Sequence, residues 1–185
     1  METHPHALDS AVVLVTGIMA AGKSTIAQHL AERLPRAAHV RGDAFRRMIV
    51  TGGADMTVEG GEDSPAREEL RLRHRISAAA ADLYAEAGVT AVVQDIVIGE
   101  DLAHYVDLVR TRPLYVVVLA PGPDAVAARE AGRAKTGYGG DWTVARLDGV
   151  LHGQTPRIGL WLDSSALTPE QTVDALLARL PEAKV

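Results

Sequence analysis

Eight consecutive residues carry the strongest chemical pattern in this sequence. They run from Gly17 to Ser24 and read G-x-x-x-x-G-K-S, and Thr25 adds a further hydroxyl. The two glycines let the backbone curve so that its N–H groups converge on an anion, and the helix that follows adds partial positive charge. A lysine at this spacing reaches the β- and γ-phosphates of a nucleotide, and the serine hydroxyl is a ligand for Mg²⁺. The pattern predicts that a nucleotide is bound by Gly17, Ala20, Ala21, Gly22, Lys23, Ser24 and Thr25, with Lys23 catalytic and Ser24 at the metal.

The segments on either side of this loop are of the type that a phosphate-binding loop requires. Residues 11–15 form an apolar, β-branched run typical of a buried parallel strand. From Lys23 to Leu34 apolar residues recur at helical spacing, and Pro35 ends the predicted helix. The structural alternative is a glycine-rich turn that closes a βα unit and binds nothing.

An aspartate follows the second predicted strand, residues 37–41. Ligands bind beyond the carboxyl ends of the strands in open parallel sheets, so Asp43 is placed where an acceptor would lie. Its spacing of 20 residues from Lys23 is also typical of the ribose-binding acid of dinucleotide folds, but their G-x-G-x-x-G pattern is absent. Two interpretations stay open: Asp43 is the base or orienting group for an acceptor hydroxyl, or it caps the helix that starts at Ala44.

Further charged residues are candidates for the acceptor site. One of Arg46 and Arg47, on the first turns of the helix after Asp43, can face the cleft and bind an anionic group, while a solvated face is the alternative. Asp95 lies in an apolar run, residues 92–98, where an unpaired carboxylate is costly. It is predicted to hold Mg²⁺ or the acceptor, and pairing with a buried Arg or Lys is the alternative. Residues 51–65 are a candidate lid, within an acceptor-binding region at about 44–75.

A second candidate lid follows the predicted strand 114–119. The helix that begins at Asp124 places Arg129 and Arg133 four residues apart on one face, before a glycine-rich segment at 136–140. Basic side chains beside such a segment fit a lid that closes over a nucleotide, at about residues 129–142. The alternative is a solvated basic turn.

The remaining pattern predicts helices that alternate with strands. A long helix is expected over 66–87, with Gly88 at its C-terminus and a mostly solvated basic face at residues 67, 71, 73, 74 and 75. Its buried stripe is predicted to consist of Leu70, Ile76, Ala80, Leu83 and Ala87. Shorter helices are expected over 101–110 and 143–151, and a last strand over 158–163. The final helix begins with a capping box at Thr168 and Gln171 and ends at about Leu180.

Composition bounds the class of protein. The 185 residues, 47% of them hydrophobic, suit a single domain over residues 1–185. The net charge of −5 disfavours a nucleic-acid or anionic-membrane binder, and the lack of cysteine excludes disulfides and thiolate zinc sites. No apolar run reaches the roughly 20 residues of a membrane span, and residues 1–10 lack a signal-peptide pattern, so a cytoplasmic location is expected.

These motifs together resemble the small P-loop kinases of the shikimate, gluconate and adenylate kinase type, and most closely the chloramphenicol phosphotransferase-like group. The resemblance rests on Gly17 to Thr25, Arg41 to Asp43, Gln94 and Asp95, Arg129 and Arg133, and Leu162 to Ser165. It implies a three-layer α/β/α fold with a five-stranded parallel sheet of order 2-3-1-4-5. It also implies that Asp43 is the base, that Arg129 lies near adenine and that Arg133 stabilises the transferring phosphoryl group.

The sequence therefore predicts a kinase that uses ATP and Mg²⁺ to phosphorylate a hydroxyl of a small molecule, either an antibiotic or other natural product or a sugar-like metabolite. Residues 41–75 carry no shikimate, gluconate or nucleotide signature, so the acceptor is not identified. One rival is a nucleotide or nucleoside kinase, although Phe45 is the only aromatic residue in that range. The other is a nucleotide-binding switch ATPase, which would have a filled cleft in place of an acceptor site. A monomer and a homodimer are both compatible with the sequence.

Overall fold

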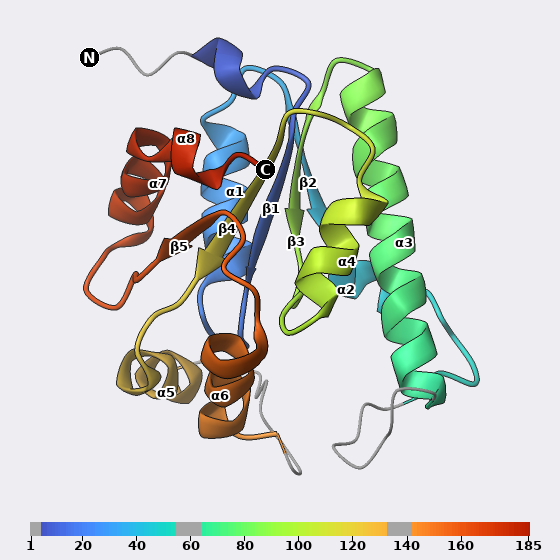
Figure 1. The fold of residues 1–185 in the computed structure, drawn as a ribbon, viewed down its shortest axis with the longest axis vertical. Coiled ribbons are helices and arrows are strands. Elements are labelled where there is room, and N and C mark those ends of the chain that lie inside the picture. The colour runs from blue at the N-terminus through green and yellow to red at the C-terminus, as the bar shows by residue number, and fades with distance from the viewer. Residues whose placement is uncertain (1–4, 55–63, 133–141) are drawn as a thin grey trace.

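A five-stranded, all-parallel sheet forms the centre of the computed structural model, which describes residues 5–54, 64–132 and 142–185 (Figure 1). The strands are β1 (Val12–Gly17), β2 (Ala37–Arg41), β3 (Thr90–Gln94), β4 (Leu114–Leu119) and β5 (Leu160–Leu162). Their order across the sheet is β2-β3-β1-β4-β5. The predicted three-layer α/β fold and strand order are confirmed.

Helices cover both faces of the sheet and the edge where the strands end. They are α1 (Lys23–Glu32), α2 (Gly42–Arg47), α3 (Pro65–Glu86), α4 (Asp101–Leu108), α5 (Pro123–Ala131), α6 (Val144–Gln154), α7 (Pro169–Ala178) and α8 (Leu180–Ala183), preceded by the 3₁₀ helix η1 (Pro5–Leu8). In Figure 1, α1 and α7 lie on one side of the sheet, α3 and α4 on the other, and α5 and α6 below the carboxyl ends of the strands. None of the described helices combines the length and the hydrophobicity that crossing a membrane requires.

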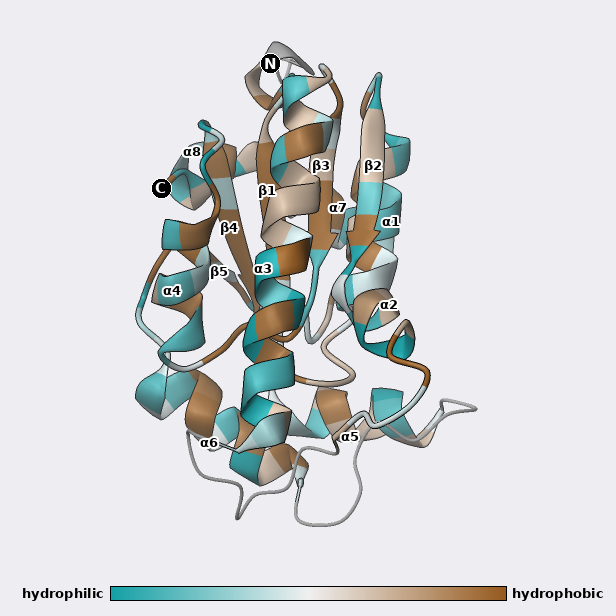
Figure 2. Ribbon diagram, turned by 90° about the vertical axis from the view of Figure 1, so that its right-hand side faces the viewer, coloured by the Kyte–Doolittle hydropathy of each residue, from teal (hydrophilic) through white to brown (hydrophobic). Residues whose placement is uncertain are grey.

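The central strands are buried along their whole length because helices cover both of their faces. Every residue of β1 and β4 is buried, and both strands are mainly Val and Leu. Figure 2 shows the central strands largely in brown, behind helix α3, which carries both teal and brown bands. Burial of these strands fixes their register, and with it the place where each strand ends and a functional loop begins.

The predicted buried stripe of α3 is wrong. Leu83 is 63% exposed and Ile76 38%, whereas the buried face consists of Ala66, His74, Ser77, Ala78, Ala81, Asp82 and Ala85. Small residues on that face let α3 approach the sheet closely, and the polar ones have partners. The Ser77 hydroxyl lies 3.0 Å from the Tyr105 hydroxyl, and Asp82 accepts the backbone N–H of Thr111 at 2.9 Å. The prediction from hydrophobic periodicity was wrong about the buried side of the helix, because the periodicity contains no information about partners on other elements.

The ends of three elements matter for the site. Strand β3 ends at Gln94, so Asp95 lies just beyond the strand rather than inside it. Helix α2 begins at Gly42 with Arg41 at the N-cap position, so the alternative in which Asp43 is the cap is wrong. The capping box at Thr168 and Gln171 is confirmed.

Candidate functional site

The phosphate-binding loop joins β1 to α1 in a conformation that suits an anion. Gly17 and Gly22 have φ of 144° and 98°, and Ala20 has a φ of 60°, which is uncommon for a residue with a Cβ atom. A Cβ atom on Gly17 would also overlap the carbonyl oxygen of Leu119, so only glycine fits there. This strained turn leads directly into the N-terminus of a ten-residue helix, whose partial positive charge favours an anion.

Lys23 and Ser24 occupy the first turn of α1, beside the loop. The Lys23 side chain is buried, with the residue 7% exposed, and its Nζ donates to the carbonyl oxygen of Ile18 at 2.7 Å. The Ser24 hydroxyl donates to Gln94 Oε1 at 3.1 Å, across from the end of β3. An ammonium group, a helix N-terminus and a glycine turn match the charge and shape of a triphosphate.

Two neighbouring side-chain oxygens, Ser24 Oγ and Gln94 Oε1, fit the needs of Mg²⁺. No group of three or more His, Cys, Asp or Glu side chains that could hold a metal ion occurs in the described ranges. Mg²⁺ commonly binds one or two protein oxygens and takes its other ligands from phosphate and water, so two oxygens beside the loop are sufficient. Gln94 was not among the predicted site residues. Its position directly before Asp95, at the end of a strand beside β1, could have indicated that it belongs to the site.

Asp95 is almost completely buried, at 2% exposure, and is paired. Its Oδ1 lies 2.9 Å from Arg73 Nη2 and accepts the Ile96 N–H at 2.7 Å. Burial raises the pKa of the Asp95 carboxyl, and the Arg73 charge opposes that rise. Smaller effects on this pKa come from Lys23, which lowers it, and from Asp43, which raises it. These three charged groups therefore share one neighbourhood.

The second oxygen of Asp95 is held against helix α2. Oδ2 has no hydrogen-bond partner among the described residues, and a Cβ atom on Gly42 would overlap it. The carboxylate thus packs directly on the backbone of the residue that precedes Asp43. Asp95 consequently connects the end of β3, the wall formed by α3 and the start of α2.

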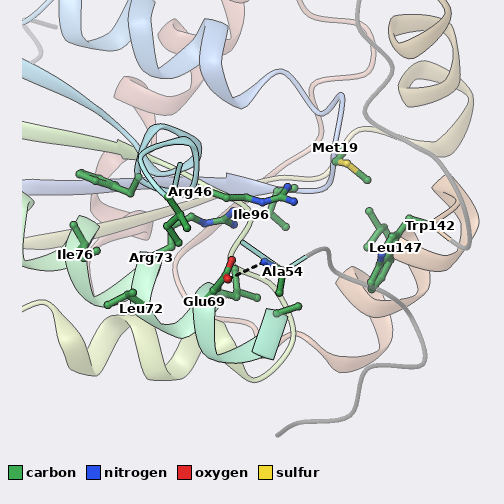
Figure 3. A pocket seen from close by; sticks show the side chains of 14 residues that line it. Met19, Arg46, Ala54, Glu69, Leu72, Arg73, Ile76, Ile96, Trp142 and Leu147 are labelled. Carbon is green, nitrogen blue, oxygen red and sulfur yellow. Dashed lines mark hydrogen bonds between the residues drawn. The ribbon is translucent and has the colours of Figure 1, made fainter. Parts of the chain in front are cut away.

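Asp43 and Arg47 form an exposed ion pair on α2. Asp43 Oδ2 lies 3.0 Å from Arg47 Nη2, one helical turn away, and the side chain of Asp43 is 53% exposed. Arg46, the residue before Arg47, instead lines a cavity, where Figure 3 shows it beside Arg73 and Ile96. Of the two predicted arginines, Arg46 is therefore the one that lines this cavity.

This cavity has a volume of about 390 Å³ and lies next to the phosphate-binding loop. Met19 of the loop forms one part of its wall. The others come from α2 and the segment after it, from α3, from the segment after β3, and from Trp142 and α6 (Figure 3). The described lining residues are Met19, Phe45, Arg46, Ile49, Ala54, Ala66, Glu69, Leu70, Leu72, Arg73, Ile76, Ile96, Trp142 and Leu147. Concave sites for small ligands have volumes of roughly 300–1,000 Å³.

The predicted solvated basic face of α3 is wrong for three of its five residues. Arg73 pairs with Asp95, Arg67 Nη1 lies 2.7 Å from Asp101 Oδ2, and His74 is 3% exposed. Arg71 and Arg75 are exposed, as expected. Arg73 is the functional candidate that the sequence did not single out from this group, because its partner lies on another element.

Arg129 reaches from α5 to the phosphate-binding loop. Its Nη1 donates to the carbonyl oxygen of Ala21 at 3.2 Å, and its Nη2 to that of Ser164 at 2.6 Å. The side chain thus connects the loop to the segment after β5. Arg133 lies outside the described residues, as do most of the two candidate lids.

A family model described as an AAA domain (AAA_33) matches residues 12–153. The chain belongs to this family. A search of curated proteins finds no match for this AAA-domain protein.

Solved structures show the same fold at low sequence identity. A sugar kinase from Janibacter sp. HTCC2649 has a TM-score of 0.67 at 22% identity, over 94% of this chain and 95% of that one. An APS kinase from Mycobacterium tuberculosis, in complex with AMPPNP and APS, has a TM-score of 0.63 at 18% identity, over 92% of this chain and 97% of that one. A tunicamycin resistance protein from Deinococcus radiodurans has a TM-score of 0.63 at 14% identity, over 95% of this chain and 98% of that one. The predicted resemblance to small P-loop kinases is confirmed for family and fold.

Proposed function

We propose that this protein is a phosphotransferase that moves the γ-phosphate of ATP to a hydroxyl group of a small molecule, an antibiotic or other natural product or a sugar-like metabolite. The observation that carries this proposal is the cavity that shares Met19 with the phosphate-binding loop. An acceptor in this cavity would lie beside a nucleotide held by the loop. A switch ATPase has no need of such a cavity, so the open space favours a kinase.

Each charged group around the loop then has a role in transfer. Lys23 would bind the β- and γ-phosphates, and Ser24, together with Gln94, would hold Mg²⁺. Bound Mg²⁺ would supply positive charge that offsets the charge of the phosphates. Arg129 would keep the loop and the nucleotide side of the site in place, and Arg133 would stabilise the phosphoryl group in the transition state.

Asp43 is proposed as the base. The acceptor oxygen forms a bond to the γ-phosphorus as the bond to the bridging oxygen breaks, ADP leaves, and Asp43 takes the hydroxyl proton. Its ion pair with Arg47 is exposed, so little energy is needed to release the carboxylate for this role. Asp95 would support either Mg²⁺ or the acceptor, and its ion pair with Arg73 favours the acceptor side.

The test incubates the protein with Mg²⁺-ATP and a panel of hydroxylated antibiotics, other alcohols, sugars and nucleosides, and identifies products by mass spectrometry. We expect one panel member to gain a phosphoryl group, and Asp43→Asn to lower the rate by about 10²- to 10⁴-fold. Asp174→Asn is the matched control, because Asp174 also forms an exposed ion pair, with Arg33, in another part of the molecule. ATP hydrolysis that is insensitive to Asp43→Asn, with no modified compound, would contradict the proposal and favour the switch ATPase.

A further inference from the structure

The chemistry of the cavity wall identifies the class of acceptor. We infer that the acceptor is an uncharged, largely apolar alcohol, rather than a sugar, a sugar acid or a nucleotide. The inference rests on the proposed function, because it concerns the acceptor of that same reaction. Three features of the described wall carry it: its apolar side chains, the shortage of neutral hydrogen-bonding groups and its balance of charge.

Most of the described wall is hydrocarbon. Eleven of its 14 residues are apolar or aromatic, and they surround the space from several sides. In Figure 3, Leu72 and Ile76 of α3 lie on one side, Ile96 near the centre, and Met19, Trp142 and Leu147 on the opposite side. A ligand that fills this space must place most of its surface against carbon atoms, which is favourable only for an apolar ligand.

Neutral hydrogen-bonding side chains are scarce in this wall. The described lining residues include no Ser, Thr, Asn, Gln, Tyr or His, and the indole of Trp142 is the only neutral polar group among their side chains. A sugar presents a hydroxyl on almost every carbon, and each hydroxyl that is buried without a partner costs about 1–3 kcal/mol. A polyhydroxylated acceptor would find only the charged groups of Arg46, Glu69 and Arg73 beside this indole, too few partners for a hydroxyl on almost every carbon.

The charges at the cavity are balanced by one another. Arg73 pairs with Asp95 at 2.9 Å, and Glu69 Oε1 accepts the backbone N–H of Ala54 at 2.8 Å, the contact drawn as a dashed line in Figure 3. Arg46 and Glu69 contribute one charge of each sign. A carboxylate, sulfate or phosphate on the acceptor would meet no net positive charge, whereas an uncharged molecule loses nothing.

The chain provides a fluorescent reporter for this cavity. It has two tryptophans, of which Trp142 lines the cavity and Trp161 lies in β5. Trp161→Phe leaves Trp142 as the single indole. The Trp161 ring N–H is buried without a hydrogen-bond partner among the described residues, so this substitution removes no such bond there. Phenylalanine also keeps an aromatic face for Arg157, whose guanidinium lies 3.9 Å from the ring centroid of Trp161.

The experiment titrates the Trp161→Phe protein, without nucleotide, with five probes and records Trp142 emission. The apolar alcohols are 3-phenyl-1-propanol and geraniol, and the others are glucose, gluconate and uridine. We expect a saturable change with the apolar alcohols only. Leu72→Gln in the same background should weaken that binding roughly 5- to 10-fold, because it places an amide in the apolar wall. Leu83→Gln, on the same helix but exposed and outside the cavity, is the matched control and should change nothing.

Phosphorylation of the same five compounds separates this inference from the proposed function. Saturable binding of an apolar alcohol that Leu72→Gln weakens supports the inference, whether or not a product forms, and absence of a product counts against the kinase alone. Phosphorylation of glucose, gluconate or uridine with no response to the apolar alcohols would overturn the inference and leave the kinase standing. Binding of the alcohols that Leu72→Gln and Leu83→Gln affect equally would also overturn it, because the ligand would then lie elsewhere.

Discussion

Gly42 and Asp95 pack directly against each other, so the size of one residue limits the position of the other's charged group. The absence of a Cβ atom at Gly42 is what lets the buried carboxylate of Asp95 lie against the start of α2. That carboxylate also holds Arg73 in the cavity wall. The backbone beside the proposed base is thus positioned by Asp95, directly after β3, and by its partner Arg73 in α3.

Gly42→Ala tests this contact. The added methyl group overlaps Asp95 Oδ2, so we expect a loss of about 1–3 kcal/mol in the free energy of unfolding, measured with urea and circular dichroism. Displacement of α2 should also lower the phosphotransfer rate through Asp43. Gly149→Ala is the control, since a methyl group there meets no atom within 4 Å and alanine favours the interior of α6. Equal stability of the Gly42→Ala protein and the wild type would show that Asp95 is not held against α2.

Helix α3 combines a structural face and a functional face on one element. Its buried side packs small residues and His74 against the sheet and α4, and its neighbouring side provides Glu69, Leu72 and Arg73 to the cavity. His74 links the two faces, because its ring packs edge-on against Tyr105 at 5.7 Å and it bonds to the backbone of Ile96, a cavity residue. Changes at this histidine therefore act on both the fold and the site.

The pH dependence of stability should reflect His74. Burial, with the charges of Arg73 and Arg67, lowers its pKa from 6.5 to about 3. Between these two pKa values the unfolded chain binds a proton at His74 that the folded protein does not bind. The free energy of unfolding therefore keeps its full value above about pH 6.5 and falls as the pH drops toward 3. From about pH 7.5 to about pH 5 the loss should be about 2 kcal/mol.

His74→Phe keeps an aromatic ring next to Tyr105 and should remove that part of the pH dependence, as measured by urea unfolding at both pH values. The protein is expected to be less stable at neutral pH, because the bond to Ile96 is lost, but its stability should change less on acidification. His104→Asn, at an exposed position on α4, is the control and should retain the slope of the wild type. A slope that stays unchanged in the His74→Phe protein would contradict the buried, neutral state of this side chain.

At the scale of the whole molecule, the parallel sheet gathers the site at one edge. Because all five strands run the same way, the segments that follow β1, β2 and β3 emerge together. They provide Lys23 at the start of α1, Asp43 in the first turn of α2, and Asp95. Helix α5 adds Arg129 from the other half of the sheet, through its bonds to Ala21 and Ser164. A nucleotide bound at the loop would therefore tie the two halves together.

Ligand binding at this edge should stabilise the entire fold. With Mg²⁺-ATP at 100 times its Kd, the gain is about 2.7 kcal/mol, which corresponds to a rise in Tm of about 5–10 °C for a domain of this size. Differential scanning fluorimetry measures this rise. Lys23→Met should reduce or abolish it, because the ammonium group that meets the phosphates is lost. Lys184→Met, at an exposed position near the C-terminus, should leave it unchanged; a full rise in the Lys23→Met protein would contradict the proposed nucleotide site.

The sequence by itself determined the phosphate-binding loop, the parallel strands and their order, since these follow from local spacing, from β-branched runs and from a resemblance that spans the chain. The capping box of α7 could also be predicted from the sequence, because a cap depends on residues three positions apart. Only the tertiary structure decided which face of α3 is buried, which of Arg46 and Arg47 lines the cavity, and that Asp95 pairs with Arg73. Those outcomes depend on partners far away along the chain. A buried charge or a small-residue face is stable only where another element supplies its counterpart, and spacing along one helix does not contain that information.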